Sequence, residues 1–370
     1  MSPNGSNFSF IAATSSVCIH RSKEVTKILI AKTRHHIVTF EAKHVIGKPH
    51  VGYITSNHWI PHGKTKNVTM SPNGSNFSFI AATSSALHRF GNLRFFQADL
   101  TNETSFDAPI AWCDIVFHVA TPINFASQDP ENDMIKPAIQ GIVNVLKACA
   151  KSNTVKRVVL TSSAAAVTIN QLNGTGLVID ESNWTDIEIL TSTKPPTCGY
   201  PVSKTSAEKE AWKFAEENNI KLITVIPSLM AGPYLTPGTP SSVDLAMSLI
   251  TGNEFLINNL KGMQMLSGSI SITHVEDVCR AHIFVAEKES ASGRYICSAV
   301  NTSVPELANF LKKRYPTSFV PTASGEFPSK AKLIMSSEKL IKEGFNFKYG
   351  IEEIYDQCVA CLKEKGLLKN

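Results

Sequence analysis

The chain has 370 residues, enough for one large α/β domain or two ordinary domains with a substantial core. Hydrophobic residues make up 43% and charged residues 18%, a composition typical of a folded protein that excludes disordered and collagen-like classes. The net charge is +5, but the excess of Lys and Arg is confined to residues 17–69 and the remainder is slightly acidic. The sequence therefore predicts no nucleic-acid partner.

The sequence also lacks the features of a secreted or membrane protein. No stretch reaches the roughly 18 consecutive apolar residues of a membrane helix, and the N-terminus lacks the basic start and apolar centre of a signal peptide. We expect a cytoplasmic protein with no integral membrane segment and with its eight cysteines reduced. Cys358 and Cys361 have CxxC spacing, but no second pair supports zinc, and the amphipathic stretch 351–368 around them predicts a helix.

Residues 1–88 differ from the rest of the chain. The sequence of residues 1–16 recurs unchanged at 70–85, and two copies are too few for a solenoid, so the repeat indicates a duplicated segment or a wrongly joined gene model. Residues 28–31 and 36–40 between the copies predict short strands. Seven histidines lie at 17–69 with only two carboxylates, and a single pair, His20 and Glu24, has i, i+4 spacing, so we predict no metal site.

From residue 89 the pattern of apolar residues becomes regular. Strands are expected at 93–98, 114–120, 155–161 and 221–227, and helices at 133–152 and 203–218. This alternation predicts an α/β fold with a doubly wound parallel sheet of Rossmann type over residues 89–227. We expect residues 228–370 to form mostly a smaller substrate-binding lobe, interleaved with the last strands of the sheet. Ligands of such sheets bind at the carboxyl ends of the strands.

Tyr200 and Lys204 place a phenol and an ammonium group on one face of a helix. A cation about 4 Å away would stabilise the phenolate by roughly 4 kcal/mol, which predicts that the pKa of Tyr200 falls from about 10 toward neutrality, where a general acid is effective. Ser163 lies just after the strand predicted at 155–161, 37 residues before Tyr200, and Pro227 ends the next predicted strand. These spacings favour a catalytic site over a simple capping role for Ser163.

Several blocks of sequence together resemble the extended short-chain dehydrogenases/reductases of plant flavonoid metabolism. The resemblance covers residues 89–370 and is closer to the anthocyanidin reductases than to the dihydroflavonol reductases of that family. The blocks are FQADLT at 96–101, VFHVATP at 116–122, DPENDMIKPAIQG at 129–141, TSSAAAVTINQ at 161–171, YPVSKT at 200–205, VIPSLMAG at 225–232 and HVEDVCRAH at 274–282.

The resemblance implies a role for each matching position. Ser163 and Tyr200 would polarise and protonate the substrate, and Lys204 would hold the nicotinamide ribose and tune Tyr200. Thr168 would contact the substrate, at a position where dihydroflavonol reductases commonly carry Asn. The remaining cofactor contacts implied for NADPH are Asp99, Leu100, Val119, Ala120, Thr121, Pro122 and Pro227.

The implied activity is that of an NADP-dependent oxidoreductase. It would reduce anthocyanidins to flavan-3-ols in proanthocyanidin biosynthesis, with a flavonoid as its small-molecule partner. The oligomeric state is not indicated by the sequence. A related reductase acting on a dihydroflavonol or a cinnamoyl-type carbonyl remains an alternative.

One part of the family pattern is missing. The family begins with a strand, a glycine-rich GxxGxxA turn and a helix that receives the cofactor pyrophosphate, and no such turn precedes residue 93. The nearest candidate, residues 47–52, has the wrong spacing and contains a proline. The first βα unit is therefore expected to be lost, and a catalytically silent chain that cannot bind NADPH is a second alternative.

Overall fold

The computed structural model describes residues 8–12, 15–19, 27–32 and 37–43, and residues 92–368 apart from 112, 126, 172–175, 196, 235–237, 317 and 319–331. Side chains are described from Ala98 onward. The second copy of the repeat, at 70–85, and the seven histidines at 17–69 lie outside the described residues. No helix in the described ranges is long and apolar enough to cross a membrane.

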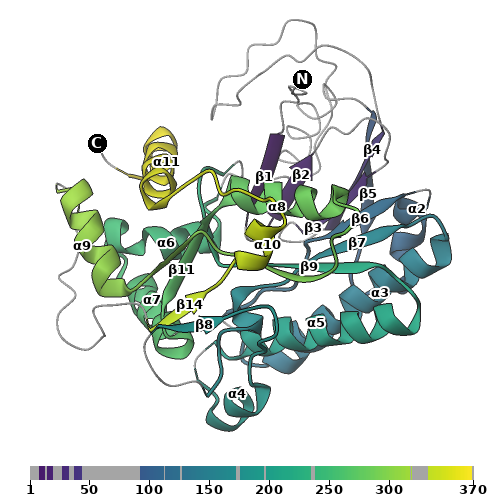
Figure 1. The fold of residues 1–370 in the computed structure, drawn as a ribbon, viewed down its shortest axis with the longest axis horizontal. Coiled ribbons are helices and arrows are strands. Elements are labelled where there is room, and N and C mark those ends of the chain that lie inside the picture. Colours follow the sequence, from purple (N-terminus) through teal and green to yellow (C-terminus); the bar gives the residue numbers. More distant parts are fainter. Residues whose placement is uncertain are drawn as a thin grey trace, which may run out of the picture.

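A seven-stranded sheet forms the centre of the molecule (Figure 1). Its order is β5-β4-β3-β6-β7-β9-β12, and every strand except β4 runs in the same direction. The strands are β3 (Lys27–Lys32), β4 (Ile37–Lys43), β5 (Asn92–Ala98), β6 (Ile115–His118), β7 (Arg157–Thr161), β9 (Leu222–Pro227) and β12 (Gly293–Cys297). The predicted Rossmann-type sheet is confirmed, including the two short strands expected before residue 45.

The strand β4 is the exception to the predicted parallel arrangement. It pairs antiparallel with β3 on one side and β5 on the other. Only four residues separate Lys32 from Ile37 in the sequence, whereas a parallel neighbour needs a crossover of a dozen residues or more. The short connection therefore makes a hairpin. A separate antiparallel hairpin, β1 (Phe8–Ala12) and β2 (Ser15–Ile19), includes part of the first repeat copy.

Helices cover both faces of the sheet (Figure 1). Val116 and Val158 belong to one core with α3 (Lys136–Ser152) and α5 (Gly199–Glu217), while Phe117 and Val159 belong to another with α8 (Val275–Glu287). Successive strand residues face opposite sides, so an apolar run is buried on both. The predicted helices at 133–152 and 203–218 are confirmed, but a π-helical turn, η3 (Glu131–Ile135), precedes α3, and α5 begins at Gly199.

The C-terminal half contributes to the central sheet and also builds a core of its own. β12 and α8 complete the sheet, while α6 (Ser241–Thr251), α7 (Glu254–Ser267), α9 (Val304–Arg314) and α11 (Ile351–Glu364) pack with the small sheet β10 (Leu229–Ala231), β11 (Ile270–His274) and β13 (Val300–Thr302). Cys358 and Cys361 are buried on α11 in this C-terminal core, which confirms that the stretch around them is a helix. The boundary between two domains at residues 227 and 228 stays a prediction.

Shorter elements connect these parts of the fold. They are η2 (Glu103–Phe106), α2 (Asp107–Ile110), η4 (Ala164–Ala166), β8 (Leu177–Ile179), α4 (Ile187–Thr193), β14 (Leu333–Met335) and α10 (Glu338–Lys342). β8 and β14 pair in parallel as a two-stranded sheet.

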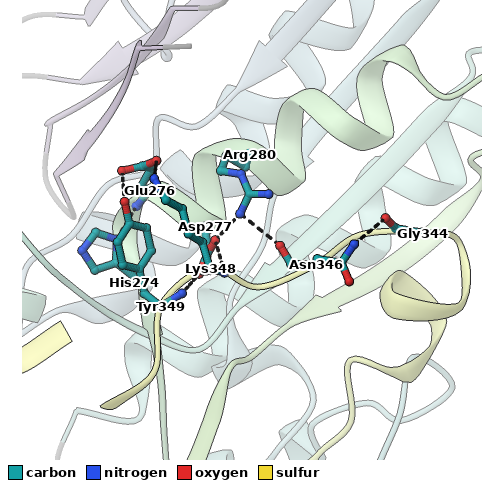
Figure 2. Close-up of polar contacts among 8 residues, drawn as sticks. All are labelled: His274, Glu276, Asp277, Arg280, Gly344, Asn346, Lys348 and Tyr349. Atoms are coloured by element: carbon teal, nitrogen blue, oxygen red, sulfur yellow. Dashed lines mark hydrogen bonds and ion pairs between the residues drawn. The ribbon is translucent and has the colours of Figure 1, made fainter. Parts of the chain in front are cut away.

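A buried carboxylate links α8 to the segment that precedes α11 (Figure 2). Asp277 on α8 is fully buried and accepts hydrogen bonds from the backbone N–H groups of Lys348 and Tyr349, at 3.0 and 3.1 Å, and from Arg280 Nη1 at 2.6 Å. The ring of Tyr349 stacks on His274, with 3.9 Å between ring centroids. The segment that leads into α11 is thereby held against α8, so much of the 274–282 block has a structural role.

Candidate active site

Three hydroxyl side chains follow one another at the carboxyl end of β7, and they have different partners. The hydroxyl of Thr161 lies 2.7 Å from His282 Nε2, and Ser162 Oγ donates to Glu208 Oε2 at 2.5 Å. Ser163 caps the short turn η4, its Oγ accepting from the backbone N–H of Ala165 at 3.2 Å, and it also shares a hydrogen bond with Tyr200. Ser163 is therefore the member of the three that faces the tyrosine.

The first turn of α5 brings Tyr200 to Ser163. Pro201 is accommodated there because the first N–H groups of a helix have no intrahelical partner. At Gly199 a Cβ atom would lie 2.5 Å from Pro130 Cβ and 2.8 Å from Met134 Cε. The absence of a side chain at Gly199 thus allows α5 to begin directly against η3, which fixes the position of Tyr200.

The pKa of Tyr200 shifts in the direction opposite to the expected one. Burial raises it above its ordinary value of 10.0, and the hydrogen bond with Ser163 only partly opposes this. The expected depression was wrong because the Lys204 ammonium group is directed elsewhere: its Nζ donates to the backbone carbonyl of Thr161 at 2.9 Å. The phenol is therefore kept in its protonated form, which is the form a proton donor needs.

Lys204 is a buried cation one helical turn after Tyr200. Burial lowers its pKa from 10.5 to about 8, against the opposing effect of the Glu208 carboxylate. Burial, followed by the positive charge of Lys204, lowers the pKa of His118 to about 3. The imidazole of His118 is therefore neutral, and Lys204 carries the positive charge of this part of the site at neutral pH.

This burial predicts a pH-dependent stability that belongs to Lys204. The unfolded chain retains the lysine proton up to about pH 10.5, while the folded chain begins to release it near pH 8. The free energy of unfolding of the wild type, measured against that of Lys204→Met, is therefore expected to rise by about 3 kcal/mol between pH 7 and pH 11. Urea denaturation at several pH values tests this. Lys213→Met, at an exposed lysine, should show no such trend.

The other predicted site residues also lie at the carboxyl edge of the sheet. Asp99 and Leu100 follow β5, residues 119–122 follow β6, and Pro227 is the last residue of β9. Leu100 is buried and its carbonyl accepts from Asn144 Nδ2 at 2.7 Å, while the Asp99 side chain, in an exposed turn, accepts from the N–H of Thr101 at 2.9 Å.

Thr168 follows the short turn η4, which Ser163 caps. Its side chain is buried, and its Oγ1 donates to the carbonyl of Ala164 at 3.0 Å. Since that hydrogen is used, Thr168 could offer a substrate only an accepting lone pair. Its place in substrate binding stays a prediction.

Two features of the site were not predicted from the sequence. Phe125, in the loop after β6, is half-exposed, and its ring centroid lies 5.4 Å from that of Tyr200. Glu208 on α5 forms a buried ion pair with Arg294 on β12, with 2.8 Å between Oε1 and Nε. Phe125 lies three residues after the 116–122 block that matches the family, which was an available signal. The pairing of Glu208 with Arg294 could not be predicted in this way, because the two residues are 86 positions apart and no local pattern links them.

The described residues fit one end of a nicotinamide dinucleotide better than the other. Tyr200, the buried Lys204 amine and Pro227 suit the nicotinamide and its ribose. Beside them, β3 passes into β4 through four residues, which leaves no room for the crossover helix whose N-terminus holds the pyrophosphate. The nicotinamide end of the site fits the cofactor, and the phosphate end does not.

A Rossmann-type sheet with Ser, Tyr and Lys gathered at its carboxyl edge defines a reductase of the extended short-chain class. The model of the NAD dependent epimerase/dehydratase family matches residues 56–297. Anthocyanidin reductase ((2S)-flavan-3-ol-forming) of Vitis vinifera is 76% identical over 284 residues, which cover 77% of this chain and 84% of that protein. Anthocyanidin reductase of Arabidopsis thaliana is 60% identical, over 76% and 83% of the two chains.

The more distant relatives that match this chain are also reductases. Dihydroflavonol 4-reductase of Gerbera hybrida is 42% identical over 75% of this chain and 74% of its own length. The crystal structure of vestitone reductase from alfalfa matches 74% of this chain and 83% of that one, at 36% identity and a TM-score of 0.62. The structure of yeast methylglyoxal/isovaleraldehyde reductase Gre2 complexed with NADPH matches 73% and 84%, at 27% identity and a TM-score of 0.60. The chain belongs to the NAD dependent epimerase/dehydratase family and, within it, to the reductases of the anthocyanidin reductase type.

Proposed function

We propose that this chain reduces an anthocyanidin to a flavan-3-ol in the cytoplasm, with NADPH as the electron donor and Tyr200 as the proton donor. The observation that carries the proposal is the hydrogen-bonded pair of Ser163 and Tyr200 at the carboxyl edge of the sheet, in a chain 76% identical to a Vitis anthocyanidin reductase. The conversion of a flavylium ion to a flavan-3-ol takes two hydrides and one proton, and two successive molecules of NADPH would supply the hydrides.

The residues of the chain have distinct tasks in this proposal. Ser163 holds the substrate oxygen by a hydrogen bond, and Tyr200, kept protonated by burial, delivers a proton to it. Lys204 is held at the end of β7 by its contact with the Thr161 carbonyl and places a positive charge near the developing negative charge. General acid catalysis of this kind typically contributes about 10² to 10⁴ in rate.

Phe125 is the group that favours a flat aromatic substrate. Phe125 is 50% exposed, and its ring lies beside Tyr200. A planar ligand at this place would cover an aromatic surface that otherwise contacts water. We propose that Phe125 and Thr168 lie on the substrate side of the site.

Replacement of Phe125 should therefore weaken substrate binding more than it affects the chemical step. For Phe125→Ala we expect KM for the anthocyanidin to rise roughly two- to tenfold, the value of one aromatic contact, with a smaller change in kcat. Steady-state kinetics at saturating NADPH measures both constants. Phe125→Tyr should retain the wild-type KM, and Phe255→Ala, at an exposed aromatic residue on α7, should have no effect.

The test of the proposed function is turnover by the purified chain. Incubated with cyanidin and millimolar NADPH, it should form a flavan-3-ol that chromatography separates from the substrate, and Tyr200→Phe should abolish the product. Reduction of a dihydroflavonol but not of cyanidin would favour the alternative of a carbonyl reductase. Binding of the flavonoid without any turnover would indicate a catalytically silent member of the family.

A further inference from the structure

The strand that should lead to the cofactor pyrophosphate leads instead into a hairpin. In a Rossmann-type sheet the pyrophosphate lies at the N-terminus of the helix that follows the first strand. β3 occupies the place of that strand, because it pairs in parallel with β6, whose carboxyl end begins the 119–122 segment. β3 ends at Lys32, and Lys32 is already paired with Ile37 of β4. The four residues between them include no glycine and are too few for a crossover helix.

The direction of β4 removes a second phosphate contact. In this class of sheet, the residues after the second strand lie at the adenosine ribose and distinguish NADPH from NADH. β4 runs antiparallel, so its last residue, Lys43, pairs with Asn92, the first residue of β5. At about 3.3 Å per residue, the end of β4 lies roughly 20 Å from the edge that holds Ser163 and Tyr200. The end of β4 at Lys43 therefore lies at the wrong edge for a 2′-phosphate.

The nicotinamide end of the site keeps its structure. Tyr200 remains hydrogen-bonded to Ser163, the Lys204 amine remains buried 2.9 Å from the Thr161 carbonyl, and Pro227 remains buried at the end of β9. From this contrast we infer that the chain holds its cofactor through the nicotinamide–ribose half, that its described residues provide no pyrophosphate or 2′-phosphate subsite, and that it does not distinguish NADPH from NADH. The inference rests on the proposed function for the identity of the cofactor, and it limits how tightly that cofactor is held.

Binding of three related ligands to the full chain tests the inference. Titration calorimetry with NADPH, NADH and reduced nicotinamide mononucleotide measures separately how much the 2′-phosphate and the AMP part contribute to binding. One charge-assisted contact to the 2′-phosphate would give NADPH at least about a tenfold preference over NADH. We expect a preference below tenfold, and a larger one overturns the inference.

The second comparison concerns the pyrophosphate. Adenine stacking alone can favour NADH over the mononucleotide by up to about a hundredfold, and pyrophosphate contacts would add to this. We expect a ratio below a hundredfold, and a larger ratio contradicts the loss of the pyrophosphate subsite. Failure of all three ligands to bind a folded chain, as judged by circular dichroism, overturns the claim that the nicotinamide half is retained.

A chimera provides the matched control. Residues 1–91 are replaced by the corresponding segment of the Vitis anthocyanidin reductase, which leaves every described residue of the catalytic end unchanged. If two or three charge-assisted contacts are restored, NADPH should bind on the order of 10² to 10⁶ times more tightly to the chimera. An unchanged affinity overturns the inference. Turnover of cyanidin by the chimera with saturating NADPH tests the proposed function independently, since a chimera that binds NADPH tightly but has no activity contradicts that function alone.

Discussion

Tyr200→Phe is expected to lower kcat by about 10² to 10⁴, the typical contribution of a general acid. The substitution removes the phenolic proton and its hydrogen bond with Ser163, while the ring beside Phe125 is retained. Single-turnover rates with saturating NADPH and cyanidin measure the loss directly. Tyr315→Phe, at a tyrosine whose hydroxyl donates to Asp356 away from the site, is the control and should keep wild-type turnover. A Tyr200→Phe variant with kcat within threefold of the wild type would exclude Tyr200 as the proton donor.

The pH profile of the wild type provides a second measure of the same group. A phenol whose pKa is raised above 10.0 remains protonated, and so active as an acid, throughout the neutral and mildly alkaline range. Titration of Tyr200 should therefore cause no fall in kcat below about pH 9, and a partial fall that begins near pH 8 would report loss of the Lys204 charge. A loss of activity that begins near pH 7 would mean that Lys204 does lower the pKa of Tyr200 when substrate and cofactor are bound.

The largest effect on stability is expected at Glu208. Its carboxylate is almost fully buried, accepts from Ser162, and pairs with Arg294, whose Nη1 also donates to the carbonyls of Glu181 and Asn183 at 2.7 Å. Glu208→Gln leaves the buried Arg294 guanidinium without its counter-charge, which should lower the free energy of unfolding by about 3 to 5 kcal/mol. Urea denaturation at pH 7 measures the change.

Two further variants separate this buried pair from ordinary surface charge effects. Glu210 pairs with Lys213 at 3.9 Å on the exposed side of the same helix, so Glu210→Gln should cost at most about 1 kcal/mol. Replacing both partners, as Glu208→Leu with Arg294→Met, should recover part of the loss, because the Arg294 guanidinium is then no longer buried without a counter-charge. A Glu208→Gln variant as stable as Glu210→Gln would show that the pair contributes nothing.

Most elements after residue 90 were predictable because their apolar periodicity is strong. The strands β6, β7 and β9 are short apolar runs, and α3 and α5 carry apolar residues at helical spacing. The boundaries were less accurate. α5 begins at Gly199, four residues before the predicted start, because Gly199 packs against Pro130 and Met134, which belong to a distant segment. A local pattern contains no information about that contact.

Within the site, residue types were easier to predict than residue environments. The sequence indicated Ser163, Tyr200 and Lys204, and the structure brings all three to the end of β7. It did not indicate that Lys204 would donate to a backbone carbonyl, so the predicted direction of the pKa shift of Tyr200 was wrong. Desolvation depends on everything packed around a group, and most of those neighbours are distant in sequence.

The alternation of strands and helices, the family and the three polar groups of the site could all be predicted from the sequence, because they depend on local periodicity and on residue identity. The sequence also shows that no glycine-rich turn precedes residue 93. Three features emerge only when the chain is folded: β4 runs antiparallel, Phe125 lies against Tyr200, and Arg294 neutralises Glu208. Strand direction and burial are set by chain connections and by packing between residues far apart in the sequence, and these in turn decide which charges and rings meet at the site.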